Sequence, residues 1–152
     1  MNKFNEFDKN GQTKVVDQLT KIFSAYTLTL DQHYIDCSTV DIYVTASTSN
    51  NKEYYYVIEA KDRQYNHNQF KSWIIELNKK NELISQTNYK PLYINTFQDN
   101  WIGVWDLSKI NFQNLQVEKK WLPKNTVIDS GKKYKDVYYL DNYKCVYFKP
   151  FV

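Results

Sequence analysis

Two β-like runs separated by a polar gap constrain the fold of this chain most strongly. The first run is Ile42 to Thr45, and Asp41 precedes it directly. The second run is Tyr54 to Ile58, and Glu59-Ala60-Lys61 follows it. The polar residues between the runs predict a turn and therefore an antiparallel hairpin. Such a hairpin can bring Asp41 beside Glu59, and Glu59 shares a face with Lys61 because side chains alternate along a strand.

This pattern predicts two carboxylates and one ammonium that converge where a strand meets a loop. Two acidic oxygen ligands suit a hard divalent cation such as magnesium. A lysine beside them suits the activation of a water molecule or the stabilisation of a phosphoryl transition state. The hairpin therefore carries a candidate site for metal-dependent phosphoryl chemistry.

The residues of this hairpin resemble the motif of the PD-(D/E)XK nuclease superfamily, which includes restriction enzymes and archaeal Holliday junction resolvases. Val40-Asp41 matches the first half of the motif, and Glu59-Ala60-Lys61 matches the second half. Val40 stands where the family name has a proline, which is a frequent departure within the family. The resemblance implies a catalytic trio of Asp41, Glu59 and Lys61. It also implies Mg²⁺, with Mn²⁺ as a substitute, held by Asp41, Glu59 and the carbonyl of Ala60.

The order of the other predicted elements agrees with this resemblance. Apolar residues at helical spacing predict one helix over Asn5 to Tyr26 and a second over Asn66 to Ser85, where Trp73 and Leu77 centre the stripe. Further strands are predicted at Thr27 to Ile35, Lys90 to Phe97 and Trp101 to Leu107. The sum is an α/β fold of order α-β-β-β-α-β-β. The resemblance implies the same order, as a restriction endonuclease-like mixed sheet flanked by helices.

The chain of 152 residues predicts a single domain that can bury a core. We place the nuclease-like core at about residues 5–107 and a β-rich C-terminal extension at about residues 108–152. Within the extension, residues 136–140 and 144–148 predict a hairpin across Asp141-Asn142-Tyr143. Lysines are dense between residues 119 and 135, with Trp121 and Tyr134 among them. Such a segment is either a strand-binding groove or a soluble loop over the domain edge.

Several residues outside the trio are candidates for supporting roles. Gln12 lies on the apolar stripe of the first helix, where many members of the resembled family carry a glutamate that reaches the metal. Asp8, one turn earlier, is an acidic alternative, and an ordinary boundary hydrogen bond is the structural alternative for Gln12. Four basic residues are candidates for substrate phosphates: Arg63, Lys71, Lys132 and Lys133. For the lysines of the second helix, a solvated face is the competing interpretation.

Composition narrows the functional classes. The net charge of +3 is compatible with nucleic acid but does not require it. With only three glycines, the chain has no phosphate-binding glycine loop. The spacing of its two histidines and two cysteines matches no zinc finger, and we expect Cys37 and Cys145 to be reduced thiols. No apolar run spans a bilayer and no signal peptide is evident, so we expect a cytoplasmic protein without membrane contact.

The sequence thus predicts a magnesium-dependent endo- or exonuclease that hydrolyses DNA. A homodimer is compatible with this prediction but is not indicated by any residue pattern. The alternative is a nucleic-acid- or protein-binding module on the same fold with little or no catalysis. Gln12 in place of an acid favours this alternative, whereas Asp41, Glu59 and Lys61 together favour the enzyme. The kind of DNA, or RNA in its place, is not predicted.

Overall fold

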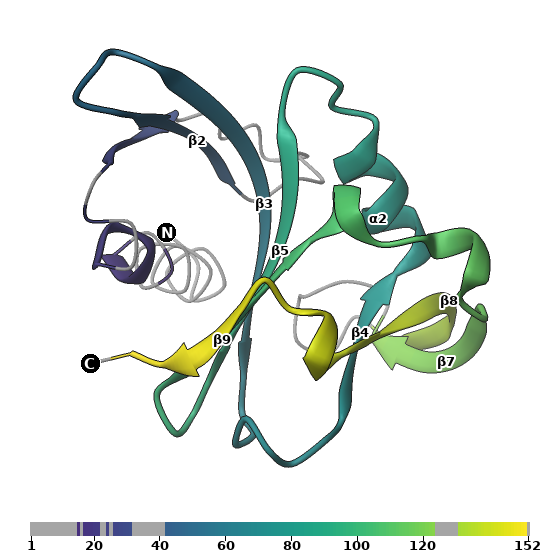
Figure 1. The fold of residues 1–152 in the computed structure, drawn as a ribbon. Coiled ribbons are helices and arrows are strands. Elements are labelled where there is room, and N and C mark those ends of the chain that lie inside the picture. The colour runs from purple at the N-terminus through teal and green to yellow at the C-terminus, as the bar shows by residue number, and fades with distance from the viewer. Residues whose placement is uncertain are drawn as a thin grey trace.

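A six-stranded mixed sheet forms the centre of the protein (Figure 1). The computed structural model describes residues 42–123 and 131–151, together with residues 15, 17–21, 24 and 26–31 nearer the N-terminus. The strand order is β1-β2-β3-β5-β6-β9. The strands are β1 Thr27–Asp31, β2 Ile42–Ser47, β3 Glu53–Arg63, β5 Lys90–Phe97, β6 Trp101–Asp106 and β9 Tyr147–Pro150. The pair β3 and β5 is parallel and the other neighbours are antiparallel, which confirms the predicted mixed α/β fold.

A smaller antiparallel sheet has the order β4-β8-β7. Its strands are β4 Ser72–Glu76, β8 Lys132–Asp141 and β7 Glu118–Pro123. Helix α2, Leu77–Ile84, follows β4 directly. Because parallel strands require a long crossover, β4 and α2 together provide the connection from β3 to β5. Three short 3₁₀ helices complete the described elements: η1 Leu107–Lys109, η2 Phe112–Asn114 and η3 Asn142–Lys144.

The large sheet has an apolar cluster on each face. On one face, Val15 and Leu19 of the N-terminal helical residues pack with Ile58 of β3 and Ile94 of β5. On the other face, α2 and the small sheet cover a second cluster that contains Trp73, Tyr93, Phe97, Trp105 and Leu140. Figure 1 shows this layering, with the N-terminal helical residues on one side of the sheet and α2 on the other. The sheet is therefore buried on both faces, as its apolar strands predict.

The predicted second helix is wrong over much of its length. Only Leu77–Ile84 is helical, whereas Ser72–Glu76 is a strand that pairs with β8. Trp73 is buried as predicted, but it shares its buried face with Ile75, two residues further on, which is strand spacing. Phe70 of the predicted stripe is exposed. A run of aromatic and β-branched residues, Trp73-Ile74-Ile75, favours a strand once a partner is available, and β8 supplies that partner from a distant part of the chain.

The predicted C-terminal hairpin is also wrong. The segment predicted as its first strand lies in β8, and β8 pairs with β4 and β7 in the small sheet. The second segment contributes to β9, which pairs with β6 in the large sheet. Between them, η3 redirects the chain from one sheet to the other. The turn predicted at residues 141–143 does separate two strands, but its residues do not indicate which strands β8 and β9 pair with.

Other predicted elements agree with the structure more closely. β5 has the predicted bounds, and β6 ends one residue earlier than predicted. Asn100 in the turn between them has a φ of 62°, which asparagine tolerates well. Val15 and Leu19 are buried as the first helical stripe requires, but Tyr26 lies in a bend before β1 and is not helical. Residues 32–35 of the predicted first strand lie outside the described residues. In the part of the chain that the structure describes, no helix is both long and apolar enough to cross a bilayer.

Candidate active site

The second half of the predicted motif, Glu59-Ala60-Lys61, lies inside β3 and not at its end. β3 continues to Arg63 because β5 pairs with it in parallel, from Tyr56 opposite Lys90 to Arg63 opposite Phe97. Alternation along the strand places Glu59, Lys61 and Arg63 on one face, the face that α2 covers. The prediction that the motif follows the strand is therefore corrected: the parallel ladder holds its backbone in extended form. The candidate site lies between this face of the large sheet and α2.

Glu59 is the centre of this site. Its side chain is almost completely buried, with 1% of the residue exposed. The Lys61 Nζ lies 3.1 Å from one carboxylate oxygen, Oε1, and the Lys79 Nζ of α2 lies 3.1 Å from the other, Oε2. A buried carboxylate is costly unless it is paired, and here each oxygen faces its own ammonium. The arrangement thus holds two ammonium groups beside one buried carboxylate.

The two lysines differ from Glu59 in their access to solvent. The side chain of Lys61 is 36% exposed and that of Lys79 is 20% exposed, whereas that of Glu59 is 2% exposed. The carboxylate therefore lies at the bottom of the site, and the ammonium groups lie between it and the solvent. A negatively charged ligand that approaches from outside would meet the lysines first.

Lys79 is a site residue whose role the sequence prediction missed. The sequence places it on the charged face of the predicted helix, with a solvated face and a contact with substrate phosphates as the alternatives. In the structure it lies in the first turn of α2, beside Lys80. Lysines are unfavourable in a first turn because the helix dipole is positive there, and this turn has no acidic residue. Tertiary partners compensate: Glu59 pairs with Lys79, and the rings of Phe112 and Tyr138 lie below the Lys80 ammonium. Two lysines in the first turn would have indicated that they need acidic or aromatic partners, but the sequence analysis did not place the helix start at Leu77.

Arg63 was predicted to reach substrate phosphates, but its guanidinium points into the protein. It donates hydrogen bonds to the Asn95 side chain at 3.2 Å, the Tyr93 hydroxyl at 2.7 Å and the Ile74 carbonyl at 3.1 Å. Burial raises the pKa of Tyr93, although the nearby Arg63 charge acts in the opposite direction. This network ties β3 to β4 and β5. In this structure Arg63 supports the site by fixing the strands around it.

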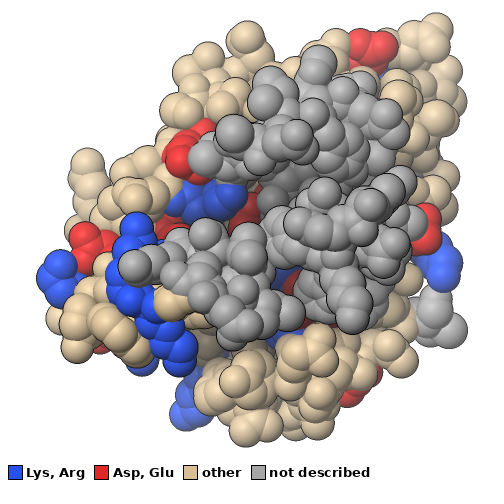
Figure 2. Space-filling view, turned by 180° about the vertical axis from the view of Figure 1, so that it is seen from behind, with Lys and Arg blue, Asp and Glu red and all other residues tan. Residues whose placement is uncertain are grey.

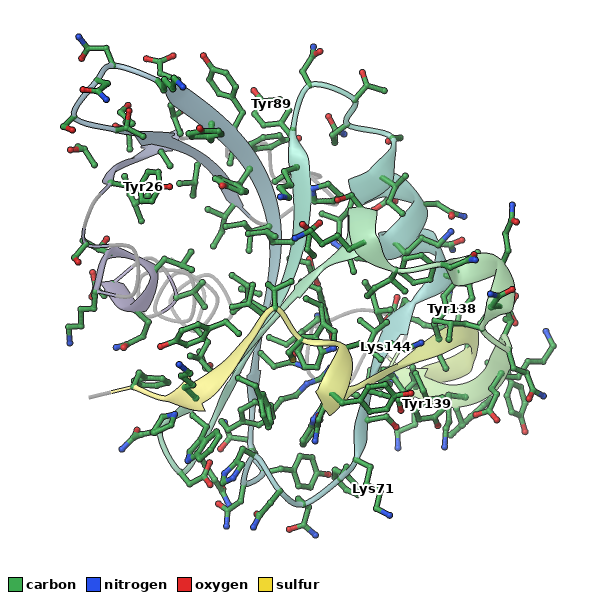
Figure 3. All side chains as sticks on the ribbon, in the orientation of Figure 1. Tyr26, Lys71, Tyr89, Tyr138, Tyr139 and Lys144 are labelled. Atoms are coloured by element: carbon green, nitrogen blue, oxygen red, sulfur yellow. The ribbon has the colours of Figure 1, made fainter. Side chains whose placement is uncertain are left out.

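The remaining predicted basic residues lie in other parts of the molecule. Lys71 is exposed just before β4, at the opposite end of that strand from α2 and Lys79, and Figure 3 shows it on the loop away from α2. The predicted helix would have placed Lys71 and Lys79 on one face, and the strand separates them. Lys132 and Lys133 are exposed at the start of β8. They belong to the small sheet.

Several predicted site residues lie outside the described residues, namely Asp8, Gln12 and Asp41. The side chain of Ala60 faces away from Glu59, because Ala60 packs against the cluster on the opposite face of the sheet. Over residues 42–123, 131–151 and the described N-terminal positions, no three His, Cys, Asp or Glu side chains form a group that could hold a metal ion. The described acidic part of the candidate site is therefore Glu59 alone.

Comparison with known proteins found similarity at the level of structure and none at the level of sequence. No family model matches the chain, and no curated protein sequence matches it. The structure is similar to that of Hjc, a Holliday junction resolvase from the archaeal hyperthermophile Archaeoglobus fulgidus, with a TM-score of 0.48 and 12% sequence identity. The match covers 89% of this chain and 86% of the resolvase chain. A likeness at this level does not define a function.

Proposed function

We propose that this protein is a metal-dependent nuclease that hydrolyses phosphodiester bonds in DNA, with Asp41, Glu59 and Lys61 as its catalytic residues. The observation that carries the proposal is the environment of Glu59. Its carboxylate is buried on one face of a central strand with two ammonium groups 3.1 Å away, and packing alone does not require this arrangement.

The pairing of β2 with β3 supports the assignment of Asp41 as the second acid. In the described register Tyr43 is opposite Val57 and Ile42 is opposite Ile58. One further antiparallel step would join positions 41 and 59. That pairing would put two carboxylates on the same face of the sheet.

The chemistry of the residues fits a hard cation. Glu59 is an oxygen donor, and its surroundings already keep two positive groups beside it. In the proposal Asp41, Glu59 and the Ala60 carbonyl would hold Mg²⁺. When bound, such an ion neutralises charge on a scissile phosphate and lowers the pKa of its bound water. It would compete with Lys79 for the Oε2 atom of Glu59.

The side chains of Glu59, Lys61 and Lys79 have different roles in the proposed reaction. Glu59 fixes the Lys61 ammonium by the 3.1 Å ion pair, so Lys61 is positioned before substrate arrives. From its partly exposed position, Lys61 orients the attacking water or stabilises negative charge on the phosphoryl group. Lys79 adds a second positive charge at the same place, which favours an anionic substrate.

One observation favours the alternative of a binding module without catalysis. Both oxygens of Glu59 have a lysine within 3.1 Å, so the carboxylate is neutralised within the protein itself. In that case the ion pairs of Glu59 with Lys61 and Lys79 would stabilise the fold. The exposed parts of the two lysines would contact nucleic acid or another protein. The two functions differ in whether divalent cations are required.

The test is a cleavage assay on plasmid, branched and single-stranded DNA, each with Mg²⁺, Mn²⁺ or EDTA. The proposal predicts cleavage with either metal, none with EDTA, and a loss of at least about a hundredfold for Glu59→Gln. Asp106→Asn is the matched control, because Asp106 is a buried acid with a lysine 3.0 Å away on the other face of the sheet. Cleavage that survives EDTA or Glu59→Gln would contradict the nuclease proposal, and metal-independent binding without cleavage would support the alternative.

A further inference from the structure

One end of the β7–β8 hairpin extends beyond the core of the protein. This basic arm consists of residues 118–123 of β7 and residues 131–136, which include the start of β8. Nearly all of its residues are exposed, whereas Val137, Tyr138 and Leu140 in the second half of β8 are buried. β7 is an edge strand of the small sheet. The arm therefore offers both of its faces to solvent.

Two aromatic rings lie exposed on the arm. Trp121 is opposite Tyr134 in the register, so the two side chains share a face, with ring centroids 4.8 Å apart. Trp121 is 55% exposed and Tyr134 is 67% exposed. The interplanar angle of 62° makes this an edge-to-face pair. Large rings that bury so little of their surface leave ring faces available for a planar ligand.

Lysines lie on both faces of the arm: Lys119 and Lys132 share the face of the aromatic pair, and Lys120, Lys133 and Lys135 lie on the other. The described arm carries five lysines and two acids: Lys119, Lys120, Lys132, Lys133 and Lys135 with Glu118 and Asp136. Lys119 pairs with Asp136 at 3.3 Å, and Lys135 pairs with Glu76 of β4 at 3.1 Å. Among the described residues, Lys132 and Lys133 make no ion pair. The arm therefore carries positive charge that no described residue neutralises.

The arm lies near the helix that supplies Lys79 to the candidate site. A hollow of about 340 Å³ lies between them, lined by Glu76 at the end of β4, by Asn78 of α2 and by Lys119 and Tyr134 of the arm. Lys79, the partner of Glu59, is the residue after Asn78. Figure 2 shows lysine and arginine side chains gathered in a band on the side of the molecule that carries α2 and the small sheet. A polyanion that lies along the arm would thus approach the candidate site.

We infer that the basic arm binds an unpaired nucleic acid strand, with bases stacked on Trp121 and Tyr134 and phosphates beside Lys132 and Lys133. Alternating stacking surfaces and positive charge are what single strands require, because every base has a ring face and every nucleotide a phosphate. A duplex hides its base faces within the helix, so the exposed rings favour the unpaired form. The inference takes nucleic acid as the ligand from the proposed function but does not depend on catalysis.

A purely structural role for the two rings makes a different prediction. Cross-strand aromatic pairs stabilise hairpins, and Trp121 and Tyr134 would then change stability without affecting a ligand. The fluorescence of Trp121 separates the two roles. The chain has four tryptophans, of which Trp73 and Trp105 are buried and Trp101 is stacked on His67. A change in emission on strand binding that Trp121→Phe removes can therefore be assigned to the arm.

The experiment titrates the full chain in EDTA with a 15-nucleotide dT strand, a 15-nucleotide U strand and a DNA duplex of the same length. We expect quenching by the unpaired strands, with dT and U distinguishing DNA from RNA, and weaker binding of the duplex. The double variant Trp121→Ala/Tyr134→Ala lacks this reporter, so its binding is measured from the fluorescence anisotropy of a dye-labelled strand, as is that of the parent protein and the control. It should bind the unpaired strand about tenfold more weakly. The matched control is Tyr143→Ala, because Tyr143 is 81% exposed outside the arm. Lys132→Gln/Lys133→Gln should reduce the salt slope by roughly 0.7 for each lysine.

The inference is overturned if emission is unchanged by the strands, if the double variant binds like the Tyr143→Ala control, or if the duplex binds as tightly as the unpaired strand. Trp121→Phe, a conservative change at an exposed position, keeps the test valid should the double variant fold poorly. The outcome is separable from the nuclease proposal. Loss of stacking with retained metal-dependent cleavage would reject the arm alone, and stacking without cleavage would reject the catalytic site alone.

Discussion

Two buried acids on opposite faces of the large sheet have contrasting surroundings. Asp106 ends β6 with 3% of its surface exposed, and it accepts hydrogen bonds from the backbone and the hydroxyl of Ser108 at the start of η1. Lys90 completes its surroundings at 3.0 Å. Glu59 lies in the middle of β3 and faces two lysines from two different elements. Asp106 thus has a local role as a helix cap, whereas the Glu59 charge cluster is assembled by tertiary structure.

This contrast is our reason for proposing that Asp106 serves folding and that Glu59 serves a ligand. The capping role explains why Asp106 is charged and buried. For Glu59, a hydrophobic residue of similar volume would fill the same space without the cost of desolvation. The ammonium partners of both acids reach partly into solvent, but Asp106 also accepts two hydrogen bonds from Ser108 as a helix cap, and Glu59 has no such capping role. We therefore propose that the chemistry lies at Glu59 and use Asp106 as its structural counterpart.

The largest effect should come from the lysine of the motif. Lys61→Ala should lower the cleavage rate by about a hundredfold or more, because the ammonium acts on the water or on the phosphoryl charge. Divalent cation binding should persist, since an ammonium is not a metal ligand, and Ca²⁺ should still support DNA binding. Lys90→Ala is the control, since it removes the lysine of the other buried acid and should leave the rate unchanged. Equal rates for Lys61→Ala and the parent would contradict the assignment.

A smaller effect is expected from Lys79. Lys79→Met removes one partner of buried Glu59 and should lower the free energy of unfolding by about 1–3 kcal/mol, as measured by urea denaturation. The same change should tighten Mg²⁺ binding severalfold, because the ammonium no longer competes for Oε2. Exposed Lys109→Met should change neither quantity. Unaltered Mg²⁺ affinity in Lys79→Met would mean that the cation does not use this oxygen.

The smallest effect concerns the structural acid and its pH dependence. Burial raises the pKa of Asp106, but hydrogen bonds from Ser108 and Lys90 outweigh it, so the pKa lies below its usual value of 3.8. A lowered folded-state pKa stabilises the protein above the unfolded value, and this contribution is lost as the pH falls through the folded pKa. Asp106→Asn should therefore cost about 1–2 kcal/mol at pH 7 and progressively less below pH 4. A cost that is the same at pH 7 and pH 3 would show that charge plays no part.

Local patterns were sufficient to predict most of the large sheet. β2, β3, β5 and β6 follow from β-branched and aromatic runs bounded by polar turns, and the alternation at Glu59 and Lys61 follows from strand geometry. These features depend on neighbours in sequence. Glu59 and Lys61 were therefore predicted on a strand pairing with β2, as the structure has them, although their position within that strand depends on parallel pairing with β5, which no local pattern encodes.

Long-range pairing explains what could not be predicted. Ser72–Glu76 was interpreted as helix because Phe70, Trp73, Ile74 and Leu77 fit helical spacing, and only pairing with β8 makes it a strand. The contact between Glu59 and Lys79 depends on where that strand ends and α2 begins. The inward orientation of Arg63 likewise depends on Tyr93 and on the Ile74 carbonyl. Each error follows from a partner far away in the sequence.

The most direct test of the central claim is Mn²⁺ binding, followed by electron paramagnetic resonance of the free ion, which requires no knowledge of the substrate. The account predicts that the parent protein and Asp106→Asn bind Mn²⁺ with the same affinity, whereas Glu59→Gln and Asp41→Asn lose binding. Circular dichroism should show all four proteins folded. Mn²⁺ binding that is unchanged in Glu59→Gln, or that is lost equally in Asp106→Asn, would contradict the assignment of Glu59 to a metal site.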